Sequence, residues 1–206
     1  MNRLISLVLL LIAPLLDLAA TARRWRWRVS SLRYFTVSAE YPGFLHRGEA
    51  AAFCLYHAKR FCRGEGVDVG AGRWPFPGAR AVEDHAEENA YHLREADGGL
   101  DFVFSSHCLE HLERWAEALQ EWRRVLKPNG ILYLYLPHPA CRMWRSEVLH
   151  HHVWQPEPDA LAEHLAGIGF EVLEHSVFAD AYLSFYVVAR KSINEAATNS
   201  AAVSKS

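Results

Sequence analysis

The sequence has no excess of basic charge, because its 22 Lys and Arg residues are balanced by 24 Asp and Glu residues, for a formal net charge of −2. Nucleic-acid backbones are usually bound by a clustered basic surface, so this balance argues against a nucleic-acid partner. A small molecule or a glycan fits the composition better as a substrate. Half of the 206 residues are apolar, which is enough for one hydrophobic core and hardly for two.

Cysteine is also scarce, and the four cysteines form no CxxC pair. The chain therefore lacks the common signature of a cysteine metal site or a redox-active disulfide. Two of them lie beside predicted core segments, so we expect buried free thiols and a reducing, cytoplasmic compartment. The four are Cys54, Cys62, Cys108 and Cys141.

An almost wholly apolar run lies at the amino terminus, Leu4–Leu16, interrupted by Pro14 and closed by Asp17. Counted to Ala22, it approaches the ~20 residues that span the hydrocarbon core of a bilayer. Three interpretations stay open: a membrane anchor, a cleaved signal ending near Ala22, and a buried apolar segment.

The residues that follow this run favour the anchor. Residues 23–28 alternate arginine with tryptophan, which suits the headgroup layer, and the heavier basic flank of such a segment tends to stay cytoplasmic. We therefore expect residues 1–28 to associate with a membrane, with the remainder of the chain at its cytoplasmic face.

The segment GVDVGAG, Gly66–Gly72, predicts a buried strand that ends in a glycine-rich turn. Val67 and Val69 are β-branched and apolar, whereas glycine tolerates positive φ and close approach of a ligand. A nucleotide-like cofactor is the expected occupant, although a glycine pair after a strand is by itself weak evidence.

Another strand is predicted in Leu100–Leu112, where apolar residues lead into Ser105, Ser106 and His107. Small polar residues at the carboxyl end of a strand are typical of the crevice in which open α/β sheets bind ligands. Hydrophobic residues then recur at helical spacing from Trp115 to Leu126.

The helix is predicted to end in a turn at residues 127–130, Lys-Pro-Asn-Gly, and the chain continues as a strand in residues 131–139. Strand, helix, turn and strand form a βαβ unit.

These segments resemble, in the same order, the motifs of the class I S-adenosylmethionine-dependent methyltransferases of the small Rossmann-like, type 11 kind. Residues 67–72 match the first cofactor motif, residues 102–112 the strand and turn beside the cofactor, and residues 123–137 the helix, turn and strand that follow. The resemblance implies S-adenosyl-L-methionine as cofactor and methyl transfer as the reaction.

The resemblance also implies roles for individual residues. Acidic Asp68 would meet the ammonium group of the methionine moiety, directly or through water, within a loop that also contains Gly70, Ala71 and Gly72. In the family, an acid at the end of the second strand binds both ribose hydroxyls, and the run Ala-Arg-Ala-Val-Glu-Asp at residues 79–84 supplies it here. The remaining implied contacts are Glu83 or Asp84 for the ribose, Asn89 and Ala90 for the adenine, and Ser105, Ser106 and His107 beside the sulfonium.

Two features depart from the family pattern. Arg73 replaces the third glycine of the loop, which makes the loop bulkier. Only residues 84–89 separate the second strand from the adenine segment, too few for the usual helix and strand. We therefore expect a sheet whose third strand is vestigial or missing.

The expected fold is α/β: a Rossmann-like, doubly wound, mostly parallel sheet, shortened around the third strand and closed by an antiparallel carboxyl-terminal hairpin. A helix is predicted over residues 46–62 and another through Leu161, Leu165 and Ile168, followed by strands at 170–177 and 182–189.

We divide the chain into a hydrophobic anchor or signal-like segment, a basic and aromatic linker that is a candidate lid, the methyltransferase domain with an apolar helix before it, and a disordered tail. The boundaries are 1–22, 23–45, 46–191 and 192–206. The sequence assigns no oligomeric state.

The acceptor is expected to be a small molecule, a lipid-linked molecule or a glycan, methylated at oxygen. A neutral imidazole near the acceptor would serve as general base, and His107 and His138 both follow strand ends that face the predicted crevice. Capping of buried polar groups is the simpler role for either histidine.

Two other functions stay open. His107-Cys108-Leu109-Glu110-His111 fits the HxxEH pattern of a zinc hydrolase, and a catalytically inactive methyltransferase fold would act as a binding module at the membrane. The sequence assigns no metal site, since the run His150–His152 is more simply an exposed turn than a chelator.

Overall fold

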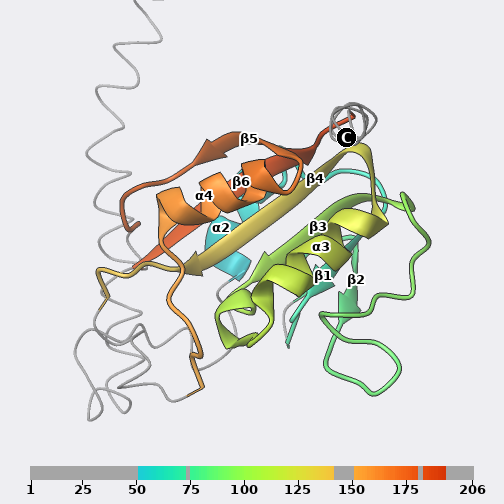
Figure 1. Ribbon diagram of the computed structural model, residues 1–206, viewed down its shortest axis with the longest axis horizontal. Helices are drawn as coiled ribbons and strands as arrows, with labels where there is room; N and C mark the ends of the chain where they lie inside the picture. The colour runs from blue at the N-terminus through green and yellow to red at the C-terminus, as the bar shows by residue number, and fades with distance from the viewer. Residues whose placement is uncertain (1–50, 73–74, 142–150, 181–182, 194–206) are drawn as a thin grey trace, which may run out of the picture. The chain divides into compact units, whose positions relative to one another are not determined.

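The computed structural model describes residues 51–72, 75–141, 151–180 and 183–193 (Figure 1). The predicted elements are present in the predicted order. They are α2 (Ala51–Ala58), β1 (Gly66–Val69), β2 (Ala79–Val82), β3 (Leu100–Ser106), the 3₁₀ helix η3 (Leu109–His111), α3 (Trp115–Val125), β4 (Leu126–Pro137), α4 (Pro158–Gly167), β5 (Phe170–His175) and β6 (Ser184–Lys191).

The strands form one mixed sheet in the order β2-β1-β3-β4-β6-β5. The first four strands run parallel, while β6 is antiparallel to both β4 and β5. The chain leaves β1 toward β2 on one side and returns to β3 on the other, which makes β1 the topological switch point. In such sheets a ligand is expected outside the carboxyl ends of the strands at this point.

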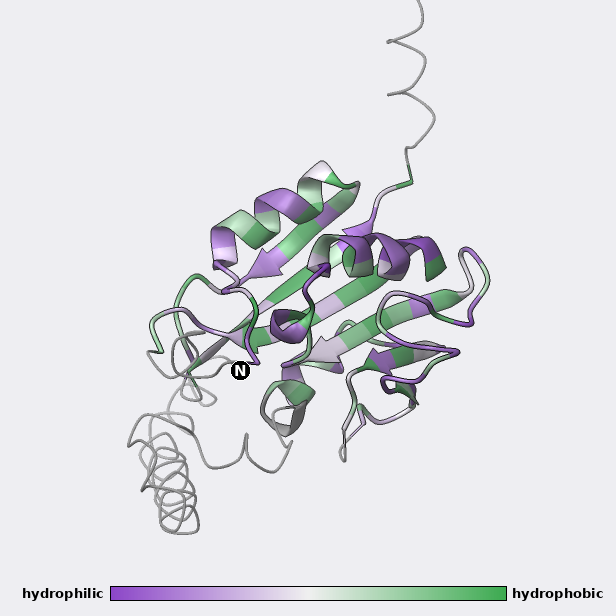
Figure 2. Ribbon diagram, turned by 60° about the horizontal axis from the view of Figure 1, so that its bottom comes forward, coloured by the Kyte–Doolittle hydropathy of each residue, from purple (hydrophilic) through white to green (hydrophobic). Residues whose placement is uncertain are grey.

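Helices cover both faces of the sheet. α3 and α4 lie on one face and α2 lies on the other, and hydrophobic residues concentrate on the strands between them (Figures 1 and 2). Trp122 of α3 is fully buried, and its indole Nε1 donates a hydrogen bond of 2.8 Å to the carbonyl of Ala90. α3 therefore fixes the chain that follows β2 as well as the sheet.

The connection from β1 to β2 is shorter than is usual between parallel neighbours. Parallel neighbours are usually joined by a crossover of a dozen residues or more with a helix, whereas the described part of residues 70–78 contains none. Phe76 takes the place of a helix face: it is 2% exposed and packs against Phe104, with ring centroids 4.7 Å apart.

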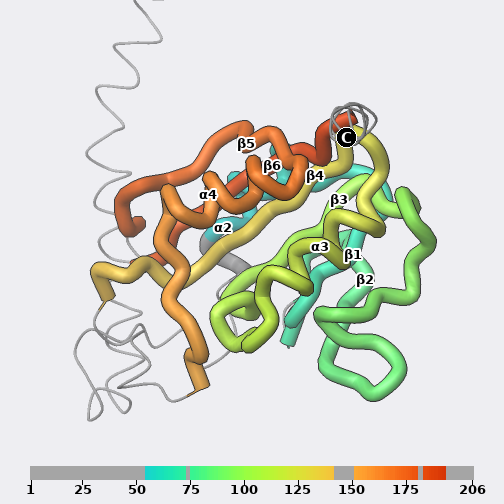
Figure 3. The backbone as a smooth tube through the Cα atoms, viewed as in Figure 1, coloured from blue at the N-terminus to red at the C-terminus, as the bar shows by residue number. Residues whose placement is uncertain are grey.

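The third strand of the expected fold is missing, which confirms the prediction. Residues 83–99, all of them described, contain no strand and form only an isolated bridge between Asn89 and His92 (Figure 3). Side-chain contacts hold this segment in place of a strand. Buried Glu88 accepts hydrogen bonds from Arg80 at 2.6 and 2.9 Å and from Arg94 at 2.8 Å.

The pKa of Glu88 reflects this arrangement. Burial alone would raise it, but the hydrogen bonds from the Arg80 and Arg94 guanidinium groups outweigh burial and lower the pKa to about 2. The carboxylate is therefore charged throughout the physiological range and ties β2 to the chain that follows it.

Two boundary predictions need correction. Residues 127–130 are no separate turn, because β4 begins at Leu126 and the Lys-Pro-Asn-Gly run lies inside it as an irregularity opposite Leu100–Phe102. Asn129 accommodates the irregularity with φ of 65°. The helix predicted over residues 46–62 ends earlier, at Ala58; its described part is Ala51–Ala58, and residues 46–50 lie outside the described residues.

The predicted anchor, linker and tail, residues 1–22, 23–45 and most of 192–206, lie outside the described residues. Among the helices that the structure describes, none is long and apolar enough to cross a bilayer.

We predict that Trp122→Ala lowers the free energy of unfolding by about 3–5 kcal/mol, because it removes a fully buried indole and leaves a cavity under the sheet. Urea unfolding followed by circular dichroism measures the change. Tyr56, which is 89% exposed, supplies the control: Tyr56→Ala should stay within about 0.5 kcal/mol. Equal losses in both variants would contradict the position of Trp122 in the core.

Candidate active site

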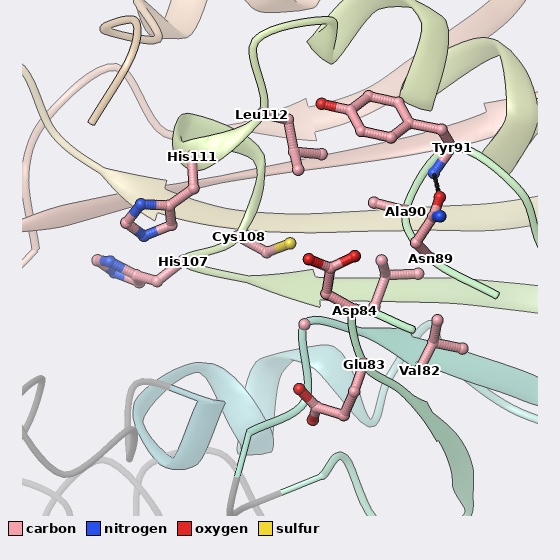
Figure 4. Close-up of a pocket in the computed structure, with 12 residues that line it drawn as sticks. Val82, Glu83, Asp84, Asn89, Ala90, Tyr91, His107, Cys108, His111 and Leu112 are labelled. Carbon is pink, nitrogen blue, oxygen red and sulfur yellow. Dashed lines mark hydrogen bonds between the residues drawn. The ribbon is translucent and has the colours of Figure 1, made fainter. Parts of the chain in front are cut away.

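A cavity of about 400 Å³ opens at the carboxyl ends of β1, β2 and β3, where the switch point predicts a ligand (Figure 4). Val69 of β1 and Val82 of β2 contribute to its wall together with residues that follow β3, and the chain after β2 closes one side. The lining residues are Val69, Gly70, Val82, Glu83, Asp84, Asn89, Ala90, Tyr91, His107, Cys108, His111 and Leu112. Six of the residues singled out in the sequence therefore meet in one cavity: Gly70, Glu83, Asp84, Asn89, Ala90 and His107.

The two ends of the cavity differ in chemistry. Asp84 and Asn89 lie together at one end, and the imidazoles of His107 and His111 lie together at the other (Figure 4). Cys108 lies between them with its thiol facing Asp84. The thiol is neutral, because burial raises its pKa to about 12.

Gly70 allows the ends of β1 and β3 to approach each other. It has φ of +76°, and a Cβ there would lie 2.5 Å from the Cβ of Cys108. Its amide donates a hydrogen bond of 2.9 Å to the carbonyl of Val82. Any side chain at this position would push Cys108 into the cavity, so glycine is required for shape as well as for conformation.

Gly72 and Ala71 differ from Gly70 in their surroundings. Gly72 has φ of +55° and is exposed, and no atom of the described residues lies within 4 Å of the position that a Cβ would take. Ala71 is buried, and neither residue lines the cavity.

Asp68 lies beneath the loop and is 1% exposed. One carboxylate oxygen, Oδ2, accepts a hydrogen bond of 2.7 Å from the amide of Phe76, while Oδ1 is buried without a hydrogen-bond partner among the described residues. Burial raises the pKa of Asp68 by more than this hydrogen bond lowers it, and the nearby charge of Glu83 raises it as well. The resulting pKa is about 7. A buried acid with one unused oxygen is a site where a cationic group would be stabilised.

Asn89 and the two serines have local partners. The Oδ1 atom of Asn89 accepts the Tyr91 amide proton at 2.9 Å, which shapes the loop at the acidic end of the cavity. The hydroxyl of Ser105 donates to the carbonyl of Val69 at 2.9 Å and so joins β3 to β1. The hydroxyl of Ser106 is buried with no hydrogen-bond partner among the described residues, and neither serine lines the cavity.

His107 ends β3 in a left-handed conformation, with φ of 50°. Its Nε2 lies 2.9 Å from the hydroxyl oxygen of Ser184 on β6, and its Nδ1 lies 3.4 Å from Oε1 of Glu110. The HxxEH pattern therefore does not lie within an α-helix, because His107 is outside η3 and η3 has three residues.

Glu110 was indicated by the sequence only through the HxxEH pattern, and its position beside His107 was not predicted. Glu110 is 0% exposed. Its Oε1 atom lies near His107 and also lies 3.7 Å from Nε2 of His111. Burial raises its pKa, but the close His107 ring and the charges of His107, His111 and His152 lower it by more, so the net direction is down. The group is a buried carboxylate surrounded by imidazoles.

His138, the other candidate base, does not line the cavity. Its Nδ1 accepts a hydrogen bond of 3.0 Å from the amide of Ala140, so its Nε2 must carry the proton that it shares with the carbonyl of Val177 at 2.9 Å. Both ring nitrogens are thus engaged by backbone groups.

Comparison with known proteins identifies the domain. The model of a family described as a methyltransferase domain matches residues 48–134, which include β1, β2, β3 and the cavity wall. No curated protein has a matching sequence.

Solved structures with the same fold include several methyltransferases. A complex of the Haloferax volcanii Trm112 methyltransferase activator with a methyltransferase gives a TM-score of 0.56 at 15% identity, covering 73% of this chain and 92% of that one. A Thermotoga maritima S-adenosylmethionine-dependent methyltransferase gives 0.51 at 16%, covering 81% and 96%. The cyclase SpnF also gives 0.51 at 16%, covering 71% and 82%.

We predict that Asp68→Asn makes the cofactor-free protein more stable above pH 7 by a few kcal/mol. The folded pKa of about 7 lies above the unfolded value of 3.8, so the folded state binds the extra proton and loses stability as pH rises from about 4 to about 7. Urea unfolding of both proteins at several pH values measures the difference, which should vanish near pH 4. A gap independent of pH would contradict the pKa of Asp68.

Proposed function

Because the chain is a class I S-adenosylmethionine-dependent methyltransferase, we propose that it methylates a hydroxyl oxygen of a small-molecule, lipid-linked or glycan acceptor. The observation that supports oxygen is the imidazole end of the cavity, where His107 has a buried carboxylate beside one ring nitrogen and a hydroxyl beside the other. A hydroxyl acceptor must lose a proton during methyl transfer, and such an imidazole removes it efficiently near neutral pH.

The residues of the cavity fit the cofactor. The unused buried Oδ1 of Asp68 supports its assignment to the cofactor ammonium group, reached directly or through one water. Gly70, Ala71 and Gly72 would border the methionine moiety, since the open space at Gly72 leaves room beside the loop.

The acidic end of the cavity fits the nucleoside. Glu83 and Asp84 follow β2 directly, and a carboxylate there accepts hydrogen bonds from both ribose hydroxyls. Asn89 and Ala90 would contact the adenine from the adjoining wall. Ser105 supports this arrangement from behind, because its hydroxyl fixes the end of β3 against β1, and Ser106 follows it at the end of the strand; neither lines the cavity.

When bound, the cofactor supplies an electrophilic methyl group, and the protein holds the acceptor in line with it. His107 takes the acceptor proton. The Glu110 carboxylate at 3.4 Å favours the ring with its proton on Nδ1, which leaves Nε2 basic. The acceptor hydroxyl would replace the Ser184 hydroxyl, 2.9 Å from Nε2 in this structure, as the group that donates to Nε2. The resulting imidazolium would be stabilised by Glu110.

The amino-terminal apolar run supports an acceptor at a membrane. Residues 1–22 would anchor the enzyme, with residues 1–28 in contact with lipid and the methyltransferase domain on the cytoplasmic side. A lipid-linked acceptor would then be concentrated beside the cavity.

We predict that amide substitutions of the cofactor residues weaken binding of S-adenosylmethionine, measured by calorimetry on the full chain. Asp68→Asn should lower affinity about tenfold or more, because it removes a charge-assisted contact, and so should one of Glu83→Gln and Asp84→Asn. Glu117→Gln on the exposed surface of α3 is the control and should change affinity less than twofold. Affinities within threefold of wild type in all three site variants would contradict the assignment.

We predict that His107→Gln lowers the rate of methyl transfer about 10²–10⁴-fold, as expected for loss of a general base, with little change in cofactor affinity. The matched control is His138→Gln, which should retain activity because His138 does not line the cavity and its ring is held by backbone groups. The assay offers methyl-labelled cofactor to lipid and glycan extracts and then identifies the labelled atom. Label on nitrogen or carbon, or an active His107→Gln, would exclude the oxygen mechanism.

A further inference from the structure

Three histidines gather beside the imidazole end of the cavity. His111 comes from η3, and His151 and His152 come from the segment before α4. One ring nitrogen of each lies within 4.8 Å of the other two. The ring centroids are 4.7 Å apart for His111 and His152 and 5.2 Å apart for the other two pairs.

The cluster is held together by the scaffold. The amide of Val153 donates to the carbonyl of Glu110 at 3.0 Å, and the indole of Trp154 donates to the carbonyl of Leu109 at 2.7 Å. Trp154 also stacks on Trp115 of α3, with ring centroids 4.4 Å apart. These contacts fix the segment on η3 without any contribution from the histidine rings, so the cluster is preorganised.

The hydrogen bond of His111 defines its free nitrogen. Its Nδ1 lies 3.0 Å from the backbone carbonyl of His151, and a carbonyl can only accept, so Nδ1 carries a proton. The neutral ring then has its lone pair on Nε2. Metal-binding histidines commonly donate one ring N–H to a carbonyl in this way, which orients the other nitrogen toward the ion.

The buried carboxylate of Glu110 supplies a negative charge at the base of the cluster. Its Oε1 lies 3.7 Å from His111 Nε2, and neither of its oxygens has a hydrogen-bond partner among the described residues. A lone pair on Nε2 and a carboxylate oxygen at this distance repel each other unless positive charge lies between or beside them. Oε1 also lies 3.4 Å from Nδ1 of His107, but burial of a carboxylate whose Oε2 has no hydrogen-bond partner among the described residues is costly for the same reason.

We propose that His111, His151 and His152 bind a divalent transition-metal ion of the zinc class, with Glu110 balancing its charge. Imidazole is a preferred ligand of Zn²⁺ and Co²⁺, and three imidazoles leave a fourth position for water or a substrate oxygen. Ligand atoms of a tetrahedral zinc site are about 3.4 Å apart. The side chains of His111 and His151 are exposed and need to move by about 1 Å from the present spacing to reach this geometry.

This site differs from the HxxEH hydrolase pattern, because His107 is not a ligand and two ligands come from a segment 40 residues later. His111 also lines the cavity, so the ion would lie beside the acceptor end and bind an acceptor oxygen. That use of the ion rests on the proposed function, whereas the binding of the ion does not.

The test is a titration of the full chain, purified without a polyhistidine tag, with Co²⁺ and then Zn²⁺. We expect one equivalent of Co²⁺ with the visible absorption of a tetrahedral site, displaced by one equivalent of Zn²⁺. His151→Ala and His111→Gln should each lower the Co²⁺ affinity at least tenfold. His85→Ala, which removes an exposed histidine outside the cluster, should leave it within twofold.

Absence of stoichiometric binding to the wild type, or binding by His151→Ala as tight as that of wild type, would overturn the metal site. Circular dichroism establishes that each variant is folded. The affinity for S-adenosylmethionine, measured on the same samples, separates the two proposals: wild type that binds Co²⁺ and not the cofactor would overturn the proposed function alone.

Discussion

The close approach of β1 to β3 at Gly70 is the constraint on which the site depends. A Cβ at this position would lie 2.5 Å from Cys108, so the two strand ends can meet only around a glycine. That contact sets the floor of the cavity, places the imidazoles after β3 opposite the acids after β2, and lets the Ser105 hydroxyl reach Val69. The chemistry of the cavity therefore follows from one missing side chain at the switch point of the sheet.

Around this contact, single side chains replace whole elements of secondary structure. Phe76 covers the face of β3 that a crossover helix would cover, and Glu88 joins Arg80 of β2 to Arg94 on the following segment, which has no strand. Trp122 and Trp154 each donate an indole proton to a backbone carbonyl of an irregular segment. Such contacts give loops a defined position, because a buried carbonyl otherwise lacks a partner.

The sequence predicted the regular elements well because they carry local patterns. The β-branched run of β1 and the helical spacing of α3 follow from periodicity, whereas the antiparallel pair β5 and β6 was expected from the resemblance to the family. The missing third strand followed from a count of residues. The strand boundary at Leu126 was not predicted, because Lys-Pro-Asn-Gly is a turn pattern in isolation, whereas in the sheet it forms an irregularity within β4.

The candidate site was predictable only in part, for a physical reason. Glycines and acids at strand ends are local signals, and five of the expected residues after β1 and β2 do line the cavity. The environment of His107 depends on Ser184, 77 residues away, and that of His111 on His151, 40 residues away. Such pairings arise from tertiary packing, which no spacing within one segment encodes.

Loss of the third strand has one more physical consequence. It leaves β2 as a terminal strand of the described sheet, with a row of backbone groups that could pair with another chain. β2 is only four residues long, and Arg80 at its second position is bound by Glu88 and Glu95. A short edge strand that carries a fixed charge is a poor template for intermolecular pairing. The ion pairs that organise the chain after β2 therefore also protect the truncated sheet from aggregation.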